Sequence, residues 1–145
     1  MADHIVYVDQ RSRELETILS GSKTLIIRGA AGRKLPYGRV FSGDTLFFVQ
    51  NNGEGRIRAT AKVRSVFNSN KLSLEESTAL IQQRQPQLQL SESQKNKYRT
   101  KRFLVLIEIG ASCEVEPFCF DRSGFGNMDD WLPVEDINRV KLSHA

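Results

Sequence analysis

The feature that most limits the possible folds is the irregular order of strand-like and helix-like segments. Apolar runs of strand length are separated by polar turns, and helical patterns occur at only two places, at 9–21 and 73–101. A series of short strands without regular β-α alternation argues against a doubly wound parallel sheet. We therefore expect an α+β fold, a small mixed β-barrel with inserted helices. The expected strands lie at 5–8, 23–28, 45–50, 56–67, 103–109, 115–120 and 139–142.

Two of these segments have informative patterns. Leu25, Ile26 and Ile27 form a continuous apolar run, which is typical of a strand buried on both faces. Residues 56–67 instead alternate between apolar and basic or polar side chains, which predicts a strand with one wet face. Ser73-Leu74-Glu75-Glu76 matches a capping box and predicts a helix that ends before Pro86.

Length and composition predict one soluble domain. The 145 residues are enough for a single domain spanning 1–145, and 39% hydrophobic with 26% charged residues is ordinary for a globular protein. The longest apolar run, 103–109, is far shorter than the roughly 20 residues of a membrane helix. The N-terminus lacks the pattern of a secretory signal, so we expect a cytoplasmic protein without a membrane segment.

Cysteine and histidine are too few and too scattered to suggest a metal or disulfide framework. Cys113 and Cys119 are the only cysteines, and the two histidines, His4 and His144, lie near the ends of the chain. This spacing matches neither a zinc site nor a disulfide scaffold. It also disfavours a catalytic triad that uses histidine. We expect no metal and no cofactor.

The basic residues fall into three groups. A net charge of +4 permits a polyanionic partner, although net charge alone does not establish one. Each group could equally be an ordinary solvated surface. The groups are Arg28, Arg33, Lys34 and Arg39 in and before a long Gly- and Pro-containing loop at 29–43; Arg56, Arg58, Lys62 and Arg64; and Lys95, Lys97, Arg99, Lys101 and Arg102.

Segment 18–28, ILSGSKTLIIR, resembles the signature of ASCH domains, in which a helix ends at a Gly, a Lys follows and a strand ends on an Arg. The GDTLFF segment at 43–48 is similar to the family's Gly-Asp followed by an apolar strand, and 59–66 resembles its next strand. The resemblance covers roughly residues 5–109. It implies a barrel related to the RNA-binding PUA domains, with a basic cleft between barrel and first helix that handles RNA or a nucleotide.

Physical chemistry gives the same residues simple roles. Gly21 can take the left-handed conformation that ends a helix. Lys23 then follows the chain reversal, and Arg28 can hold a phosphate or carboxylate with its planar fork. The alternative roles are an ordinary surface lysine for Lys23 and a salt bridge at the strand end for Arg28. Asp44 is interpreted as a turn residue.

An enzymatic branch of the family hydrolyses the amide of N4-acetylcytidine with a Lys, a Thr three residues later and a Glu from the helical insertion. The resemblance places that Lys at Lys23 and the Glu at Glu75 or Glu76, with Thr24 as a displaced substitute for the Thr. The Thr position itself is Ile26, which cannot act as a nucleophile. Enzymatic activity therefore stays uncertain, and the sequence disfavours it.

The main functional hypothesis is a binding module for RNA or a nucleotide-like ligand. Bases of single-stranded RNA stack on flat side chains, which makes exposed aromatics candidates beside the basic residues. Trp131 fits a core position better than a binding role. The alternatives are the amidohydrolase and a protein-interaction domain with an acidic partner. The predicted ligand-binding residues are Lys23, Arg28, Arg33, Lys34, Tyr37 and Phe125.

Overall fold

The computed structural model of the protein describes residues 1–126 and 129–142. Six strands and three α-helices follow one another in an irregular order, with a short 3-10 helix near the end. The strands are β1 (Asp3–Val8), β2 (Leu25–Ala30), β3 (Thr45–Gln50), β4 (Arg56–Asn68), β5 (Phe103–Cys119) and β6 (Trp131–Glu135). The helices are α1 (Glu14–Leu19), α2 (Leu74–Leu88), α3 (Glu92–Arg99) and the 3-10 helix η1 (Ile137–Arg139).

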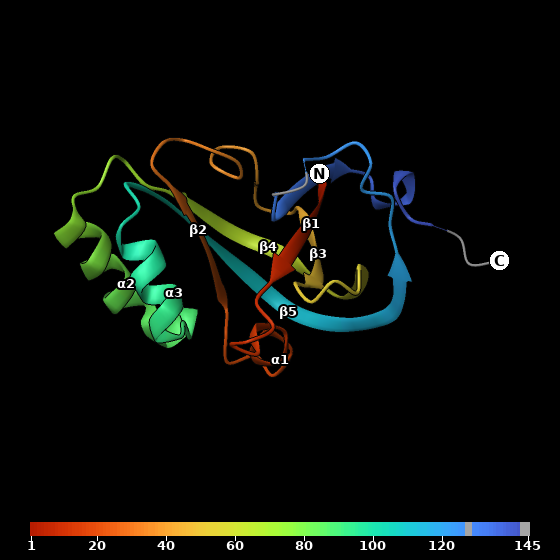
Figure 1. Cartoon of the computed structure of the whole chain (residues 1–145), viewed down its shortest axis with the longest axis horizontal. Helices are drawn as coiled ribbons and strands as arrows, with labels where there is room; N and C mark the ends of the chain where they lie inside the picture. Colours follow the sequence, from red (N-terminus) through yellow and green to blue (C-terminus); the bar gives the residue numbers. More distant parts are fainter. Residues whose placement is uncertain (127–128, 143–145) are drawn as a thin grey trace.

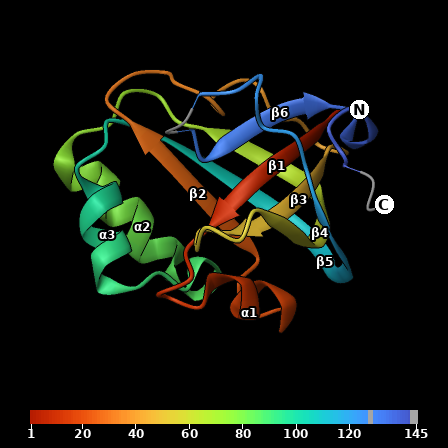
Figure 2. The ribbon, with the colours of Figure 1, turned by 45° about the vertical axis from the view of Figure 1, so that its right-hand side comes forward.

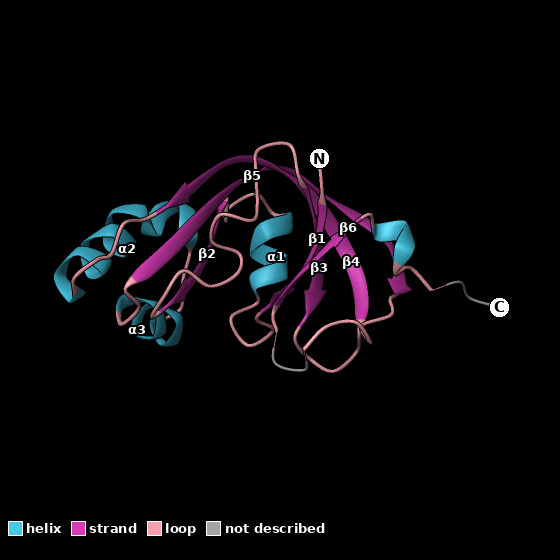
Figure 3. Cartoon of the chain, turned by 90° about the horizontal axis from the view of Figure 1, so that it is seen from above, coloured by secondary structure: helices cyan, strands magenta, loops and turns pink. Residues whose placement is uncertain are grey.

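All six strands belong to one mixed sheet in the order β2-β5-β4-β3-β1-β6. The β1–β3 pair is parallel, and the other neighbours are antiparallel. The sheet curls into a half-barrel (Figure 1), and Figure 3 shows it arching over α1. Register shifts in the long β4–β5 pair accompany the bend, since bulges increase local twist. These observations confirm the predicted α+β fold with a mixed, barrel-like sheet.

Strand β2 separates two cores, as its continuous apolar run predicts. The side chain of Ile26 packs inside the half-barrel with Val6 and Trp131. On the other face, Leu25 and Ile27 pack with apolar residues of the helical layer. The sequence interpretation of a strand buried on both sides is therefore confirmed.

The helices occupy both sides of β2. Helix α1 places Leu15 and Ile18 in the barrel core, while α2 and α3 lie beside β2 at the far end of the sheet (Figure 2). Gly21 has a φ of +83° in the turn after α1, the left-handed conformation expected at this helix end. The capping box at the start of α2 is present, with the Ser73 hydroxyl accepting from the backbone N–H of Glu76.

Several expected boundaries are wrong. Helix α2 continues through Pro86 to Leu88, because a proline in the last turn removes only one hydrogen bond before the left-handed Gln89 ends the helix. The two strands expected at 103–109 and 115–120 are one strand, β5. The strand expected at 139–142 is also absent; the chain there forms η1, and one isolated bridge joins Phe120 to Lys141.

The loop expected at 29–43 begins later than predicted, because Gly29 and Ala30 belong to β2. A search of the described helices finds none that is both long and apolar enough to cross a membrane.

Candidate ligand-binding cleft

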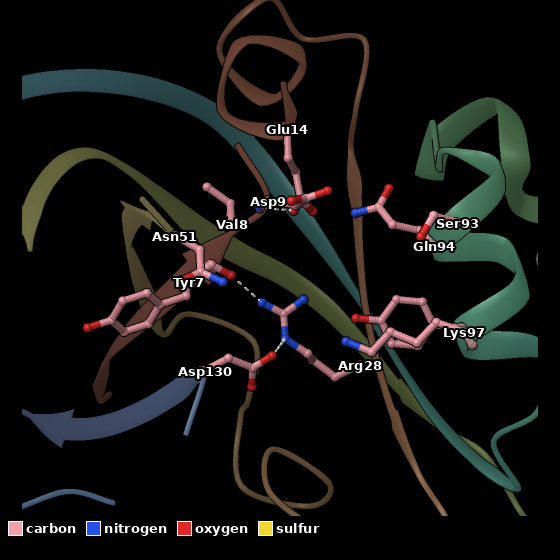
Figure 4. Close-up of a pocket in the computed structure, with 11 residues that line it drawn as sticks. Tyr7, Val8, Asp9, Glu14, Arg28, Asn51, Ser93, Gln94, Lys97 and Asp130 are labelled. Atoms are coloured by element: carbon pink, nitrogen blue, oxygen red, sulfur yellow. Dashed lines mark hydrogen bonds and ion pairs between the residues drawn. The ribbon is translucent and has the colours of Figure 1, made fainter. Parts of the chain in front are cut away.

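A polar cleft of about 240 Å³ lies between the end of the half-barrel and α3. Six separate parts of the chain meet there: β1 with the turn after it, the start of α1, β2, the β3–β4 turn, α3, and the residue before β6 (Figure 4). The lining residues are Tyr7, Val8, Asp9, Glu14, Arg28, Asn51, Ser93, Gln94, Lys97, Tyr98 and Asp130.

Arg28 lies at the centre of this cleft (Figure 4). The residue is only 7% exposed, and its guanidinium lies 5.7 Å from the centre of the Trp131 ring. Nη1 donates to the carbonyl of Ile27 at 2.8 Å, and Nη2 donates to the carbonyl of Tyr7 at 2.6 Å. Nε lies 3.2 Å from a carboxylate oxygen of Asp130, which is near enough for an ion pair. The N–H of Nε nevertheless forms no hydrogen bond within the described part of the chain. A guanidinium has five N–H donors, so several remain for a ligand.

Lys23 lies behind the cleft and not in its lining. The side chain is 1% exposed, and its Nζ donates to the carbonyl of Leu88 at 2.5 Å. It also lies 3.4 Å from the carboxylate of Glu14, whose other oxygen accepts from the backbone N–H of Asp9 at 2.8 Å. Burial lowers the pKa of Lys23, and the Glu14 carboxylate opposes that shift. Lys23 thus joins α1 to the end of α2 and positions Glu14, which does line the cleft.

The other predicted ligand-binding residues do not line the cleft. Arg33 stacks over the ring of Tyr37, whose hydroxyl donates to the carbonyl of Ser69 at 2.6 Å. Lys34 is exposed on the same loop. Phe125 is half-buried and packs against a further apolar cluster of the sheet, which includes Phe118 and Phe120. Of the six predicted residues, Arg28 alone is among the lining residues.

The residues predicted for an amidohydrolase are also not brought together. Glu75 and Glu76 are exposed in the first turn of α2, and Glu76 is engaged in the capping box. Thr24 is outside the lining, and its backbone N–H donates to the carbonyl of Gln87. The carboxylate beside Lys23 is Glu14, a residue that the sequence interpretation did not single out.

The charge of the cleft differs from the basic cleft that the sequence resemblance implies. Its cations, Arg28 and Lys97, face three carboxylates, those of Asp9, Glu14 and Asp130. The cleft is therefore polar and of mixed charge instead of basic. The difference arises because the first and third basic groups each contribute a single cation to the lining, and the second group contributes none.

A buried hydrogen-bonded chain supports the floor of the site. The indole N–H of Trp131 donates to Nδ1 of His4 at 3.0 Å, and Nε2 of His4 lies 2.8 Å from Asp44. Because an indole can only donate, we assign His4 as the neutral tautomer that carries its proton on Nε2. The Trp131 ring in turn lies 5.7 Å below the guanidinium carbon of Arg28.

Asp44 is therefore more than a turn residue. Its carboxylate accepts from the backbone N–H groups of Ala2 and Phe41, each at 3.0 Å, as well as from His4. Burial alone would raise the pKa of Asp44, but the hydrogen bonds from Ala2, His4 and Phe41 outweigh burial and lower it.

The curled mixed sheet, with one helix on its concave side and two beside its edge, is an ASCH-type fold. Among solved structures, the ZmASCH Y47F mutant protein from Zymomonas mobilis aligns with a TM-score of 0.69 over 96% of this chain and 94% of that chain, at 13% identity. The ASCH protein from Zymomonas mobilis aligns with a TM-score of 0.65 over 92% of this chain and 87% of that chain, at 14% identity.

No protein-family model and no curated protein matches the sequence. The structural alignments confirm the ASCH-type fold implied by the sequence resemblance. At 13–14% identity, the similarity is evidence for the fold alone.

Proposed function

We propose that this protein is a PUA-like binding module that holds a nucleotide-like ligand, free or within RNA, in the cleft around Arg28. The observation that carries the proposal is a buried guanidinium whose N–H groups are only partly used by the protein. Buried polar groups without partners cost free energy. A ligand with phosphate or base oxygens would supply the missing acceptors, and arginine matches such groups with a planar fork.

The mixed polarity of the lining favours a nucleotide over a simple anion. Lys97 offers donors, Asp9 and Glu14 offer acceptors, and the amides of Asn51 and Gln94 offer both. Base edges also present donors and acceptors side by side. The volume of about 240 Å³ is below the roughly 300–1,000 Å³ of common small-molecule sites, which suits one nucleotide unit or part of it.

Arg28→Lys is expected to raise the Kd for ribonucleoside monophosphates about tenfold or more, equivalent to about 1.4 kcal/mol. Lysine keeps the charge but loses the planar fork. Isothermal titration calorimetry with the four monophosphates measures the change. Lys62→Gln on exposed β4 is the control and should leave the Kd unaltered. Equal losses in the two variants would indicate diffuse attraction to a basic protein, and unchanged binding by Arg28→Lys would contradict the proposed site.

A second candidate function, amide hydrolysis, is favoured by one observation. Lys23, with its lowered pKa, lies beside Glu14, whose carboxylate lines the cleft. Against this candidate, Ile26 is completely buried at the position of the expected nucleophile.

We therefore expect no appreciable deacetylation of N4-acetylcytidine by the native protein. Chromatographic detection of the product cytidine measures this activity. An isoleucine offers no group that can attack the amide. Ile26→Thr is the informative variant, because it restores the hydroxyl and is expected to give at most trace turnover. Robust turnover by the native protein, lost in a folded Lys23 variant, would instead establish the enzyme.

A further inference from the structure

The face of the sheet opposite Arg28 carries a second pocket, beside α2. Residues that pair directly across neighbouring strands have their side chains on the same face of a sheet. Glu108 pairs with Leu25 of β2 and with Ser65 of β4, so these three side chains form one row across β2, β5 and β4. Leu25 packs with the helical layer, which places the row on the outer face. Because side chains alternate along a strand, Arg28 points to the other face.

Helix α2 covers the β2 side of this outer face and leaves the β4 side open. Its Ile81 and Leu88 pack in one cluster with Leu25 and Leu106. Phe67, the β4 partner of Leu106, remains 49% exposed. Between the helix and these strands lies a pocket of about 150 Å³, which we call the Gln87 pocket. Phe67 lines it, and its polar lining residues are Ser65, Arg84, Gln87 and Glu108.

The pocket contains a buried acceptor that the protein leaves unused. Arg28 Nε and Gln87 Oε1 are the buried side-chain atoms without a hydrogen-bond partner in residues 1–126 and 129–142. Buried polar atoms nearly always have a partner in the protein, in water or in a ligand. One water needs only roughly 10–15 Å³, whereas a cavity of about 150 Å³ can hold a molecule the size of benzene. The Gln87 pocket therefore has room for a small ligand that donates to Oε1.

Two side chains of opposite charge line the same pocket. Arg84 of α2 and Glu108 of β5 form no ion pair with each other or with any other residue that the structure describes. One oxygen of Glu108 accepts from the Ser65 hydroxyl at 3.1 Å. A simple anion would meet the carboxylate of Glu108, and a simple cation would meet the guanidinium of Arg84. A ligand that carries both charges matches the lining better than either.

We propose that the Gln87 pocket binds a small zwitterionic α-amino acid. The ligand carboxylate pairs with Arg84, whose planar guanidinium can donate two parallel N–H groups to it. The ligand ammonium has three donors, enough for both Glu108 and the buried Oε1 of Gln87. A short aliphatic side chain contacts the exposed ring of Phe67. Alanine, serine and valine are close to benzene in size and fit this volume, whereas tryptophan is far larger.

The test is an NMR titration of the ¹⁵N-labelled native protein with L-alanine, L-serine, L-valine and L-tryptophan. The three small amino acids should give saturable shifts of the backbone amides of Ser65, Gln87 and Glu108, and tryptophan should give none there. Propionate lacks the ammonium of alanine, and ethylamine lacks its carboxylate. Each should bind about tenfold more weakly than alanine or worse, because each loses a hydrogen-bonded charge.

Two variants remove the charged partners one at a time. Arg84→Gln and Glu108→Gln should each raise the Kd for L-alanine about tenfold or more. Both residues are exposed, so the variants should fold normally. The matched controls, Arg56→Gln and Glu75→Gln, remove the same charges from exposed positions outside the pocket and should leave this Kd unaltered.

Gln87→Met separates ligand binding from a structural role of the amide. This variant keeps the length of the side chain and removes the buried acceptor. It should weaken alanine binding without lowering the stability of the ligand-free protein, since it removes a buried oxygen that has no partner.

Three results would overturn the proposal. The first is the lack of saturable shifts at the pocket with all three small amino acids, which would leave Gln87 to water alone. The second is an equal Kd for alanine, propionate and ethylamine, or an equal Kd in the pocket variants and their controls. The third is a set of alanine-induced shifts confined to the Arg28 cleft on the other face of β2.

Discussion

Lys23→Ala is expected to destabilise the protein by about 3–5 kcal/mol, the usual cost of removing one partner of a buried ion pair. The variant leaves the Glu14 carboxylate without its cation and the Leu88 carbonyl without its donor. A small domain has a total stability of only about 5–15 kcal/mol, so the loss would be large. Urea unfolding monitored by circular dichroism measures the free energy of unfolding.

A double-mutant cycle measures the interaction energy between Lys23 and Glu14 separately from the effects of the single substitutions. Lys23→Met combined with Glu14→Gln should recover much of the loss, because the unpaired buried charge is gone. A loss below about 1 kcal/mol in Lys23→Ala, the range of exposed ion pairs, would contradict a structural role for Lys23.

Asp44→Ala is expected to cost about 3 kcal/mol, because three donors, those of Ala2, Phe41 and His4, lose their acceptor. The same substitution should loosen the Trp131 ring below Arg28, since His4 would lose the bond that fixes its orientation. Urea unfolding gives the energy, and near-ultraviolet circular dichroism reports on the single tryptophan. A stability within about 0.5 kcal/mol of the native protein, as for an ordinary surface change, would contradict the buried chain.

The contribution of Asp44 should also depend on pH. The folded state lowers the pKa of this carboxyl, so the unfolded chain takes up its proton first as the pH falls. The stabilisation is complete above the ordinary aspartate pKa of about 4 and is lost as the pH falls through the lower folded value. Asp44→Asn should therefore lose less stability than the native protein as the pH falls below the ordinary aspartate pKa of about 4.

Local signals in the sequence predicted much of the fold. The left-handed Gly21, the capping box at Ser73 and the two-sided burial of Leu25–Ile27 each depend on residues within a few positions of one another. The resemblance of 18–28 to ASCH domains placed these elements in the right fold. It also led to Arg28, the one predicted binding residue that lines the cleft.

The rest of the site depends on contacts between distant strands. His4 joins Asp44 and Trp131 only because β1 pairs with β3 on one side and with β6 on the other. Glu14 meets Lys23 because the chain reverses after α1, although a glutamate in a first helical turn ordinarily faces water. No local pattern distinguishes these residues from turn formers and surface charges, so sequence reasoning passed over them.

The most direct test of the Arg28 cleft is a titration of ¹⁵N-labelled protein with ribonucleoside monophosphates, followed by NMR. Binding in the cleft predicts saturable shifts of the backbone amides of Asp9, Arg28, Gln94 and Lys97, together with the indole N–H of Trp131 below the Arg28 guanidinium. The amides around Lys62 on β4 should not shift. Saturable shifts confined to β4, with the cleft amides unmoved, would contradict the assignment of the cleft as the ligand site.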